Sequence, residues 1–288
     1  MASFDYQTAF SRNIGWVTRD EQEKLRNQRI AIAGMGGVGG VYLLTLTRLG
    51  IGNFNLSDFD TFELGNFNRQ AGAALSTLGR PKLEVMAESA LDINPTLNIR
   101  QFPSGISADN VDEFLHDVDL YVDGLDFFVL DARRAVYQAC AERGIPVVVA
   151  APLGMGVSNI NYLPGGMPLN RYFDFRDGLS ETELAIRFLV GLSPAVLQAR
   201  YLADTSAVRF KEKKGPSTPM ACELCAGVAG TAALKILLGR GKVISAPDSF
   251  HFDAYLNKAV HVRRPGGNRN PLQRLALAIA RRRFGKFS

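Results

Sequence analysis

Residues 29–70 constrain the fold more than any other segment of the chain. A short apolar run over residues 30–33 leads directly into a glycine-rich turn that contains Gly34, Gly36 and Gly39. A helical pattern follows the turn, and a second apolar run ends at Asp58. Strand, glycine turn, helix and strand in this order predict a βαβ unit of the kind that binds nucleotides.

The three glycines fit the pattern G-x-G-x-x-G, and Gly37 adds further freedom to the turn. Glycine allows positive φ and a close approach of the backbone to a ligand. The free N–H groups and the positive dipole end of the following helix then make an anion site. Asp58 lies nineteen residues after Gly39, near the spacing of about 20 expected for a ribose-binding acid. The turn therefore predicts nucleotide binding, although it does not distinguish a dinucleotide from ATP.

The alternation of apolar runs and helical patterns continues to residue 152. It predicts an α/β fold, a Rossmann-like doubly wound and mostly parallel sheet covered on both faces. Ligands bind such sheets at the carboxyl ends of the strands, where the glycine turn, Asp58 and residues 123–126 are expected. The strands are predicted at residues 30–33, 54–58, 97–102, 119–123 and 145–150.

A different pattern begins after Pro152 and predicts a C-terminal α+β extension. It combines loops, a capped helix after Ser180, a helical stretch at residues 194–202, an apolar helix at 222–238 and a hairpin at 250–263. We divide the chain into a nucleotide-binding domain (1–152), an extension that closes the substrate side (153–270) and a terminal helix (271–288).

The composition narrows the class of protein. A hydrophobic content of 47% with 21% charged residues indicates a globular chain. No uninterrupted run of about 18 apolar residues occurs, and the first residues lack the pattern of a secretion signal. Only three cysteines are present, which suits a reducing compartment. These features together predict a cytoplasmic protein.

The positive charge is concentrated at the C-terminus. Residues 254–288 contain nine Lys/Arg and no acid, which leaves 24 basic against 28 acidic residues elsewhere. In the terminal helix, Leu272, Leu275, Ala276 and Ile279 form one apolar face, which we expect to dock on the fold. The basic end of this helix suits its negative dipole end. Alternative partners are tRNA, an acidic protein or an anionic membrane surface.

Four polar positions downstream of the glycine turn carry a resemblance to a known family. The run GNFNRQ contains Asn66 and Arg69, GRPK ends at Lys82, and DGLD ends at Asp126. Together with the turn and the segment SRN near the start, these motifs resemble the ThiF/MoeB/HesA adenylyltransferases, the group that includes ubiquitin-activating enzymes. The resemblance is close over residues 8–152 and loose over the helix at 222–238.

This resemblance implies roles for individual residues. The glycine turn would hold the phosphates of ATP, Asp58 would hold the ribose, and Asp126 would bind Mg²⁺. Arg12 matches the arginine that such enzymes insert into the partner's site, so a homodimer is implied. The catalytic set is Arg12, Arg69, Lys82 and Asp126, and the ATP-binding set is Gly34, Gly36, Gly37, Gly39, Asp58, Asn66, Arg69 and Lys82.

The implied chemistry is carboxylate activation. A carboxylate oxygen attacks the α-phosphorus of ATP, which gives an acyl-adenylate and pyrophosphate. Negative charge builds on the phosphoryl oxygens and the leaving group, and cations held there beforehand stabilise it. No general base is required because the carboxylate is already ionised.

The cysteines depart from the family pattern. Many members build a structural zinc site from two C-x-x-C pairs, whereas this chain has the single pair Cys222 and Cys225. Structural zinc takes four ligands, so we do not expect zinc. Near a helix start the two thiols are either reactive, through a pKa lowered by the helix dipole, or buried as small hydrophobes.

The substrate stays open at this stage. The acyl group could come from the C-terminus of a ubiquitin-like or sulfur-carrier protein, from a peptide, or from another small acid. Residues 78–88 and the Ile93-Asn-Pro run also resemble tRNA threonylcarbamoyladenosine dehydratases. An NAD-dependent oxidoreductase with the same turn would need a Tyr-x-x-x-Lys or a His/Asp pair, which we do not find. A catalytically inactive adaptor is disfavoured by the intact polar set.

Overall fold

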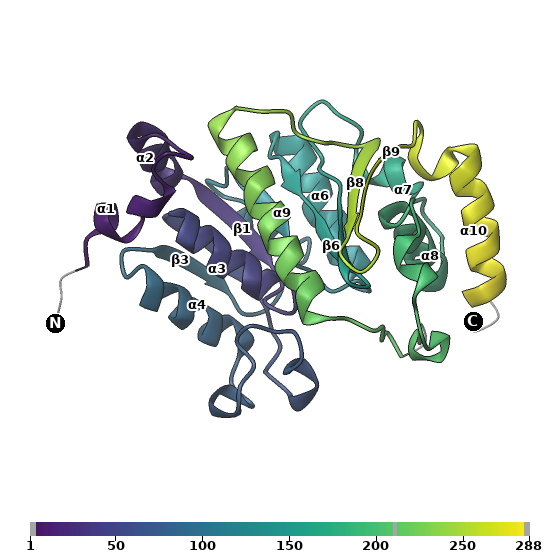
Figure 1. Cartoon of the computed structure of the whole chain (residues 1–288), viewed down its shortest axis with the longest axis horizontal. Helices are drawn as coiled ribbons and strands as arrows, with labels where there is room; N and C mark the ends of the chain where they lie inside the picture. Colours follow the sequence, from purple (N-terminus) through teal and green to yellow (C-terminus); the bar gives the residue numbers. More distant parts are fainter. Residues whose placement is uncertain (1–3, 210–211, 285–288) are drawn as a thin grey trace.

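The computed structural model describes residues 4–209 and 212–284. Its centre is a parallel sheet of five strands in the order β3-β2-β1-β4-β5 (Figure 1). This is the doubly wound order of Rossmann-like folds, as predicted, and its switch point lies between β1 and β4. The strands are β1 (Arg29–Ala33), β2 (Asn53–Ser57), β3 (Asn98–Phe102), β4 (Leu120–Asp123) and β5 (Val147–Val148).

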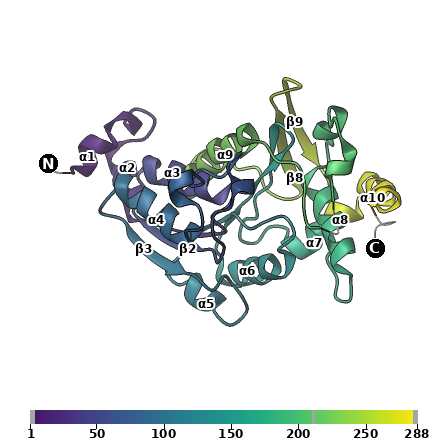
Figure 2. The same cartoon turned by 90° about the horizontal axis from the view of Figure 1, so that it is seen from below.

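Helices cover both faces of this sheet. In Figure 2, α3, α4 and α9 lie on one face, and α5 and α6 lie on the other. The short α1 and the capped α2 precede β1, and Thr18 and Glu21 form a capping box at the start of α2. The helices are α1 (Tyr6–Ala9), α2 (Arg19–Asn27), α3 (Gly39–Leu49), α4 (Lys82–Ile93), α5 (Val111–Phe114), α6 (Leu130–Arg143) and α9 (Pro219–Leu238).

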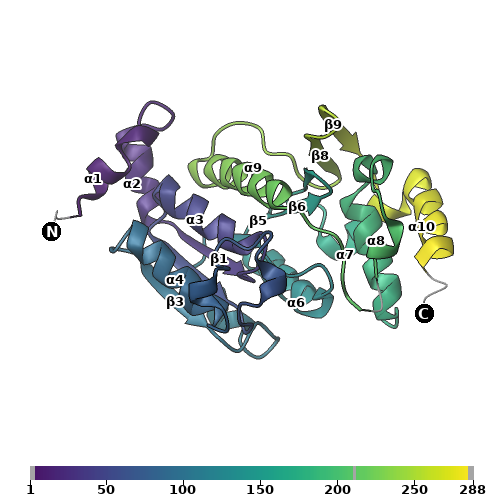
Figure 3. The ribbon, with the colours of Figure 1, turned by 60° about the horizontal axis from the view of Figure 1, so that its bottom comes forward.

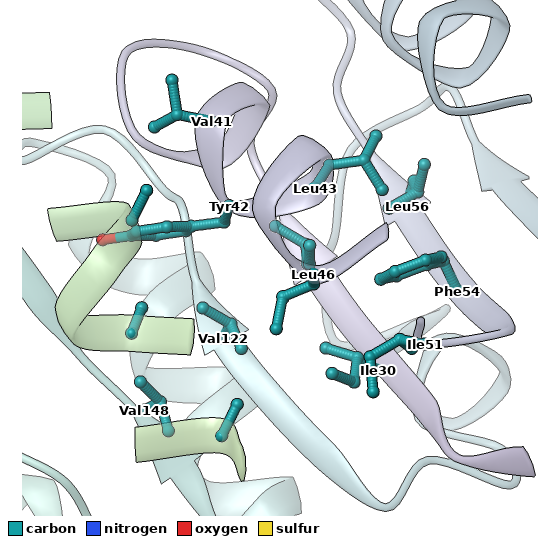
Figure 4. Packing of buried hydrophobic residues seen from close by; sticks show 14 of the residues in the cluster. Ile30, Val41, Tyr42, Leu43, Leu46, Ile51, Phe54, Leu56, Val122 and Val148 are labelled. Atoms are coloured by element: carbon teal, nitrogen blue, oxygen red, sulfur yellow. The ribbon is translucent and has the colours of Figure 1, made fainter. Parts of the chain in front are cut away.

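The central strand β1 supplies side chains to two cores. Ile30 and Ile32 point into the core beneath α3 and α9, whereas Ala31 and Ala33 face the core beneath α6. All five residues of β1 are buried, as expected for the middle of a covered parallel sheet. Figure 4 shows Leu46 of α3 packed close to the sheet residues of the first core. The turn that follows β1 is therefore attached to the buried centre of the sheet.

The extension forms a second sheet, which is antiparallel with the order β6-β7-β8-β9. Its strands are β6 (Ala150–Leu153), β7 (Gly156–Asn159), β8 (Asp248–Asp253) and β9 (Lys258–Arg263), so the predicted hairpin is confirmed. The predicted fifth strand at 145–150 is two strands in the structure. Residues 147–148 join the parallel sheet as β5, and Ala150 begins β6 of the second sheet. The prediction of a helix at 194–202 was wrong. Val196 is left-handed (φ 50°), and only a 3₁₀ turn, Leu197–Arg200, follows it.

Helix α9 connects the two sheets. It contacts α3 on one side and β6 and β7 on the other (Figure 3). By length and composition alone, α9 is long and apolar enough to cross a membrane. The sequence analysis did not indicate this, because it considered only uninterrupted runs of apolar residues. Half of its most apolar window is buried inside the fold, and these contacts are those of a core helix.

The terminal helix docks through a different face from the one predicted. Helix α10 (Pro271–Phe284) packs on α8 (Glu181–Leu192) near α7 (Leu169–Phe173), at the end of the molecule opposite the N-terminus (Figure 1). Its buried residues are Gln273, Leu277 and Ala280. The Gln273 amide donates to the carbonyl of Val190 over 3.0 Å, so a polar residue fixes the docked face. Of the expected docking residues, Leu272, Leu275 and Ile279 are about 60% exposed, whereas Ala276 is partly buried and packs against the docked cluster.

Candidate active site

The glycine turn is held by backbone packing against the loop after β4. Gly34 has φ 88°, and a Cβ there would lie 2.3 Å from the carbonyl oxygen of Gly124. A Cβ on Gly39 would lie 1.7 Å from the carbonyl oxygen of Gly34. Both glycines are required because no side chain fits between these two backbone segments.

The other side of the turn is more open. A Cβ on Gly36 would meet nothing closer than the Gln70 amide nitrogen at 3.7 Å. Helix α3 begins at Gly39 and no side chain caps its N-terminus. Oε1 of Gln70 is buried without a hydrogen-bond partner in the described part of the chain. The uncapped helix end on this open side of the turn fits a phosphate-bearing ligand, whereas the unpaired oxygen of Gln70 is an acceptor and would need a donor from such a ligand.

Asp58 is tied directly to the turn. Its carboxylate accepts the N–H of Met35 over 2.6 Å and that of Asp60 over 2.7 Å. Burial raises the pKa of Asp58, and these two hydrogen bonds oppose that shift. A carboxylate has more acceptor sites than these bonds use. Asp58 is thus held at the carboxyl end of β2, with capacity left for two hydroxyls.

Lys82 is the first residue of α4 and lies at the same end of the sheet. Its ammonium group is 2.9 Å from Oδ2 of Asp60, and its side chain is only 8% exposed while that of Asp60 is 54% exposed. Asp60 therefore orients a buried cation in this structure. The Asp60 carbonyl also accepts the backbone N–H of Lys82, which fixes the start of α4 against β2.

Arg69 lies over the turn, and Asn66 shapes the loop that carries it. A Cβ on Gly37 would be 3.7 Å from the Arg69 side chain. The Arg69 guanidinium donates to the Gly65 carbonyl and the Asn68 side chain. The Asn66 amide oxygen accepts the N–H of Glu63. The structure thus brings Arg69 to the turn, while the amide oxygen of Asn66 caps its own 3₁₀ turn.

Asp126 is exposed on the loop whose Gly124 packs against the turn. Its Oδ1 accepts the N–H of Phe128 over 3.0 Å. No three His, Cys, Asp or Glu side chains within the described residues group as metal ligands. Mg²⁺ typically takes one or two carboxylates together with substrate phosphates and water. A single exposed carboxylate beside an anion site fits that ion.

A buried ion pair that the sequence analysis missed holds this loop. Arg133 of α6 donates to Asp123 over 2.7 Å and to the carbonyls of Leu125 and Asp126. Tyr137 also donates to Asp123. Burial by itself lowers the pKa of Arg133. The negative charge of Asp123 is the main opposing effect, and the pKa of Arg133 is raised overall. The signal in the sequence was weak, because α6 carries further charged residues, among them Arg134 and Arg143, and only packing shows that Arg133 is the buried one.

Arg12 does not reach the site of its own chain. It lies in the 3₁₀ turn Ser11–Asn13, and Asn13 donates to the carbonyls of Arg48 and Leu49 at the far end of α3. The eleven residues of α3 separate this turn from the glycines by about 16 Å. Arg12 makes no side-chain hydrogen bond or ion pair with any residue the structure describes.

Cys222 is packed against the glycine turn. A Cβ on Gly37 would lie 3.3 Å from its sulfur, and both Cys222 and Cys225 are buried. Burial raises the pKa of both thiols, although Ser217 and Arg69 oppose the shift at Cys222. Of the two alternatives left by the sequence, the structure favours small buried side chains over reactive thiolates.

The comparison with known families agrees with these motifs. Residues 10–275 match the sequence profile of the ThiF family. The chain belongs to the ThiF family. It is 31% identical over 151 residues to a tRNA threonylcarbamoyladenosine dehydratase of Bacillus subtilis, covering 52% of this chain and 57% of that protein.

A second relative has a different activity in its name. The chain is 27% identical over 250 residues to the probable adenylyltransferase/sulfurtransferase MoeZ of Mycobacterium tuberculosis, covering 74% of this chain and 63% of MoeZ. The chain thus spans about three fifths of the length of both relatives. The crystal structure of PaaA superposes with a TM-score of 0.68 at 19% identity and covers 91% of this chain and 84% of PaaA, which supports the fold.

Proposed function

We propose that this ThiF-family chain is an ATP-dependent adenylyltransferase that activates a carboxylate as an acyl-adenylate. One arrangement carries the proposal: the uncapped start of α3, flanked by Arg69, Lys82 and the loop of Asp126. Asp58 at the next strand end would receive the ribose hydroxyls. The family match favours ATP over a nicotinamide dinucleotide, since the motifs that follow the glycine turn are those of the ThiF family.

Each residue then has a defined task. The backbone N–H groups at Gly36 and Gly37 bind phosphate oxygens, because the space beside Gly36 is open and α3 directs its positive end there. Arg69 and Lys82 stabilise the charge that grows as pyrophosphate leaves. Asp126 would hold Mg²⁺, which neutralises phosphate charge when bound. Arg133 positions Asp126 by holding its loop through two carbonyls.

We further propose that two copies complete each other's sites. Arg12 lies at the end of α3 that is far from its own nucleotide site, and the neighbouring Trp16 is 84% exposed. The loop around the site exposes further large apolar side chains, among them Phe59, Leu64 and Leu75. Exposed apolar groups at both places are typical of a surface that is covered in an assembly. A symmetric dimer would bury both sets and insert Arg12 near the partner's phosphates.

The substrate we favour is the C-terminal carboxylate of a ubiquitin-like or sulfur-carrier protein, or of a peptide. The similarity to MoeZ over most of the chain supports it. A second candidate is a threonylcarbamoyl carboxylate on tRNA. The identity of 31% to a dehydratase of that class supports this candidate, as does the basic C-terminal segment.

ATP–pyrophosphate exchange with candidate carboxylates tests the proposal. We expect carboxylate-dependent exchange in the wild type and a loss of at least about a hundredfold in Arg69→Ala and in Asp126→Ala, because each removes transition-state charge stabilisation. Arg80→Ala is the matched control, since Arg80 lies near Lys82 but pairs with Glu88 at the surface.

Circular dichroism should show that both variants fold, because Arg69 and Asp126 make few side-chain contacts. Exchange at the wild-type rate in both variants would show that these two residues do not act on the phosphates. A hydride transfer to NAD⁺ in place of exchange would overturn the proposed activity.

A further inference from the structure

A second charged site lies between α8 and α10, in the extension. It is a cleft of about 760 Å³, within the usual size range of ligand sites. Five arginines line it, from different segments of the extension: Arg176, Arg187, Arg269, Arg274 and Arg281. None of them belongs to the nucleotide site described above.

Two carboxylates of the chain itself lie among these arginines. Asp174 accepts hydrogen bonds from Arg176, Arg187 and Arg269 at 2.5–3.1 Å. Glu183 accepts from Arg187 and Arg281. Five guanidinium groups against two carboxylates leave a net charge of +3 around the cleft.

The excess charge is exposed. The side chains of Arg176 and Arg269 are about 60% exposed, whereas that of Arg187 is 9% exposed. Arg187 therefore forms the floor with Asp174, and the others form the rim. Arg274 lines the cleft without a side-chain hydrogen bond or ion pair to any described residue.

The rim retains many hydrogen-bond donors. Arg269 uses only its Nε–H toward Asp174 among the described residues, and a guanidinium has five N–H donors. Arg274 and Arg281 are seven residues apart on one helix, which separates them by about 10 Å along the axis. A ligand with several phosphate groups in succession can therefore contact the rim at more than one arginine.

We propose that this arginine cleft binds the phosphodiester backbone of RNA. Arginine forks match phosphate oxygens in a bidentate way. Residues 254–288 contain nine basic residues and no acid, which suits a uniformly negative polymer better than a protein surface of mixed charge. The inference concerns a docking surface and does not depend on the proposed adenylation.

The cleft is joined to the nucleotide site by α8. Arg187 of α8 forms the floor of the cleft, and the next residue, Phe188, packs against Phe127 with ring centroids 5.2 Å apart. Phe127 follows Asp126 directly. Phe188 also lies under the Arg133 guanidinium at 4.5 Å. Two adjacent residues of α8 thus link the floor of the cleft to the loop of Asp126, so a polymer bound in the cleft could extend toward the nucleotide site.

Fluorescence anisotropy with labelled bulk tRNA tests the proposal on the full chain. We expect Arg274→Glu to weaken binding about tenfold, the effect of one charge-assisted hydrogen bond. The slope of log K against log salt should become shallower by about 0.7 for each phosphate that the variant no longer neutralises. Arg19→Glu, an equal charge change on the exposed first turn of α2, should bind tRNA like the wild type.

Several outcomes would overturn the proposal. These are unchanged tRNA affinity in Arg274→Glu, an equal loss of affinity in Arg19→Glu, or binding of polyglutamate or of anionic lipid vesicles without binding of tRNA. ATP–pyrophosphate exchange should stay at the wild-type rate in Arg274→Glu. Loss of exchange with tRNA binding intact would place Arg274 in the adenylation site and contradict the assignment.

Discussion

Alanine substitutions in the glycine turn should separate structural glycines from ligand-binding ones. Gly36→Ala meets no atom closer than 3.7 Å and needs no positive φ. We therefore expect it to leave stability unchanged or to raise it by up to about 1 kcal/mol, because alanine restricts the unfolded chain. Gly39→Ala places a Cβ 1.7 Å from a backbone oxygen, and overpacking of this kind costs about 3 kcal/mol or more.

Although Gly36→Ala should not reduce stability, we expect it to weaken the binding of ATP. The new methyl group would stand on the open side of the turn and displace at least one phosphate contact, which corresponds to about 1.5–3 kcal/mol or a tenfold or greater loss of ATP affinity. Urea denaturation measures the first quantity, and isothermal titration with ATP and Mg²⁺ measures the second. A Gly36→Ala variant that binds ATP like the wild type, or that unfolds as readily as Gly39→Ala, would refute this reasoning.

Three further predictions concern the buried ion pair, a buried histidine and the docked face of α10. Arg133→Met leaves Asp123 buried without its cation and should lower the free energy of unfolding by about 3–5 kcal/mol; the double variant with Asp123→Asn should recover part of this loss in urea denaturation. Burial, with a smaller effect of Arg264, lowers the pKa of His251 from its usual 6.5 to about 4. The folded state thus favours neutral His251. The contribution of this residue to the free energy of unfolding is complete above pH 6.5 and is lost as the pH falls toward 4. Stability should drop by about 2 kcal/mol between pH 7 and 5, and a His251→Gln variant that shows the same drop would contradict this cause. Leu277→Asp should destabilise the docked α10, whereas Leu275→Asp on its exposed side should not; equal thermal shifts would show that the docked face is misassigned.

The sequence predicted most of the first sheet because its signals are local. Buried parallel strands such as β1 are continuous apolar runs, and the turn after β1 has a fixed glycine pattern. The face on which α10 docks was not predictable in this way. Hydropathy selected Leu272, Leu275 and Ile279, but the docked face contains Leu277 and Ala280 together with Gln273, whose amide donates to a carbonyl of α8.

The site could be predicted where residues are linked by motif, and not where they are linked by packing. Arg69 and Lys82 could be proposed as site residues because they follow the turn in recognisable motifs, and the structure places Arg69 beside the turn. The pair of Arg133 and Asp123 was missed because most arginines are exposed, and a single sequence does not show which arginine is buried. The contact of Cys222 with Gly37 joins positions almost two hundred residues apart, and no local pattern reports it.

A crystal structure with ATP and Mg²⁺ bound tests directly whether the glycine turn binds the phosphates of ATP. We expect phosphates on the N–H groups of Gly36 and Gly37, with Arg69 and Lys82 turned toward them and Mg²⁺ on Asp126. Triphosphate bound in the arginine cleft while the glycine turn stays empty would contradict it, as would Arg69 and Lys82 turned away from bound phosphates.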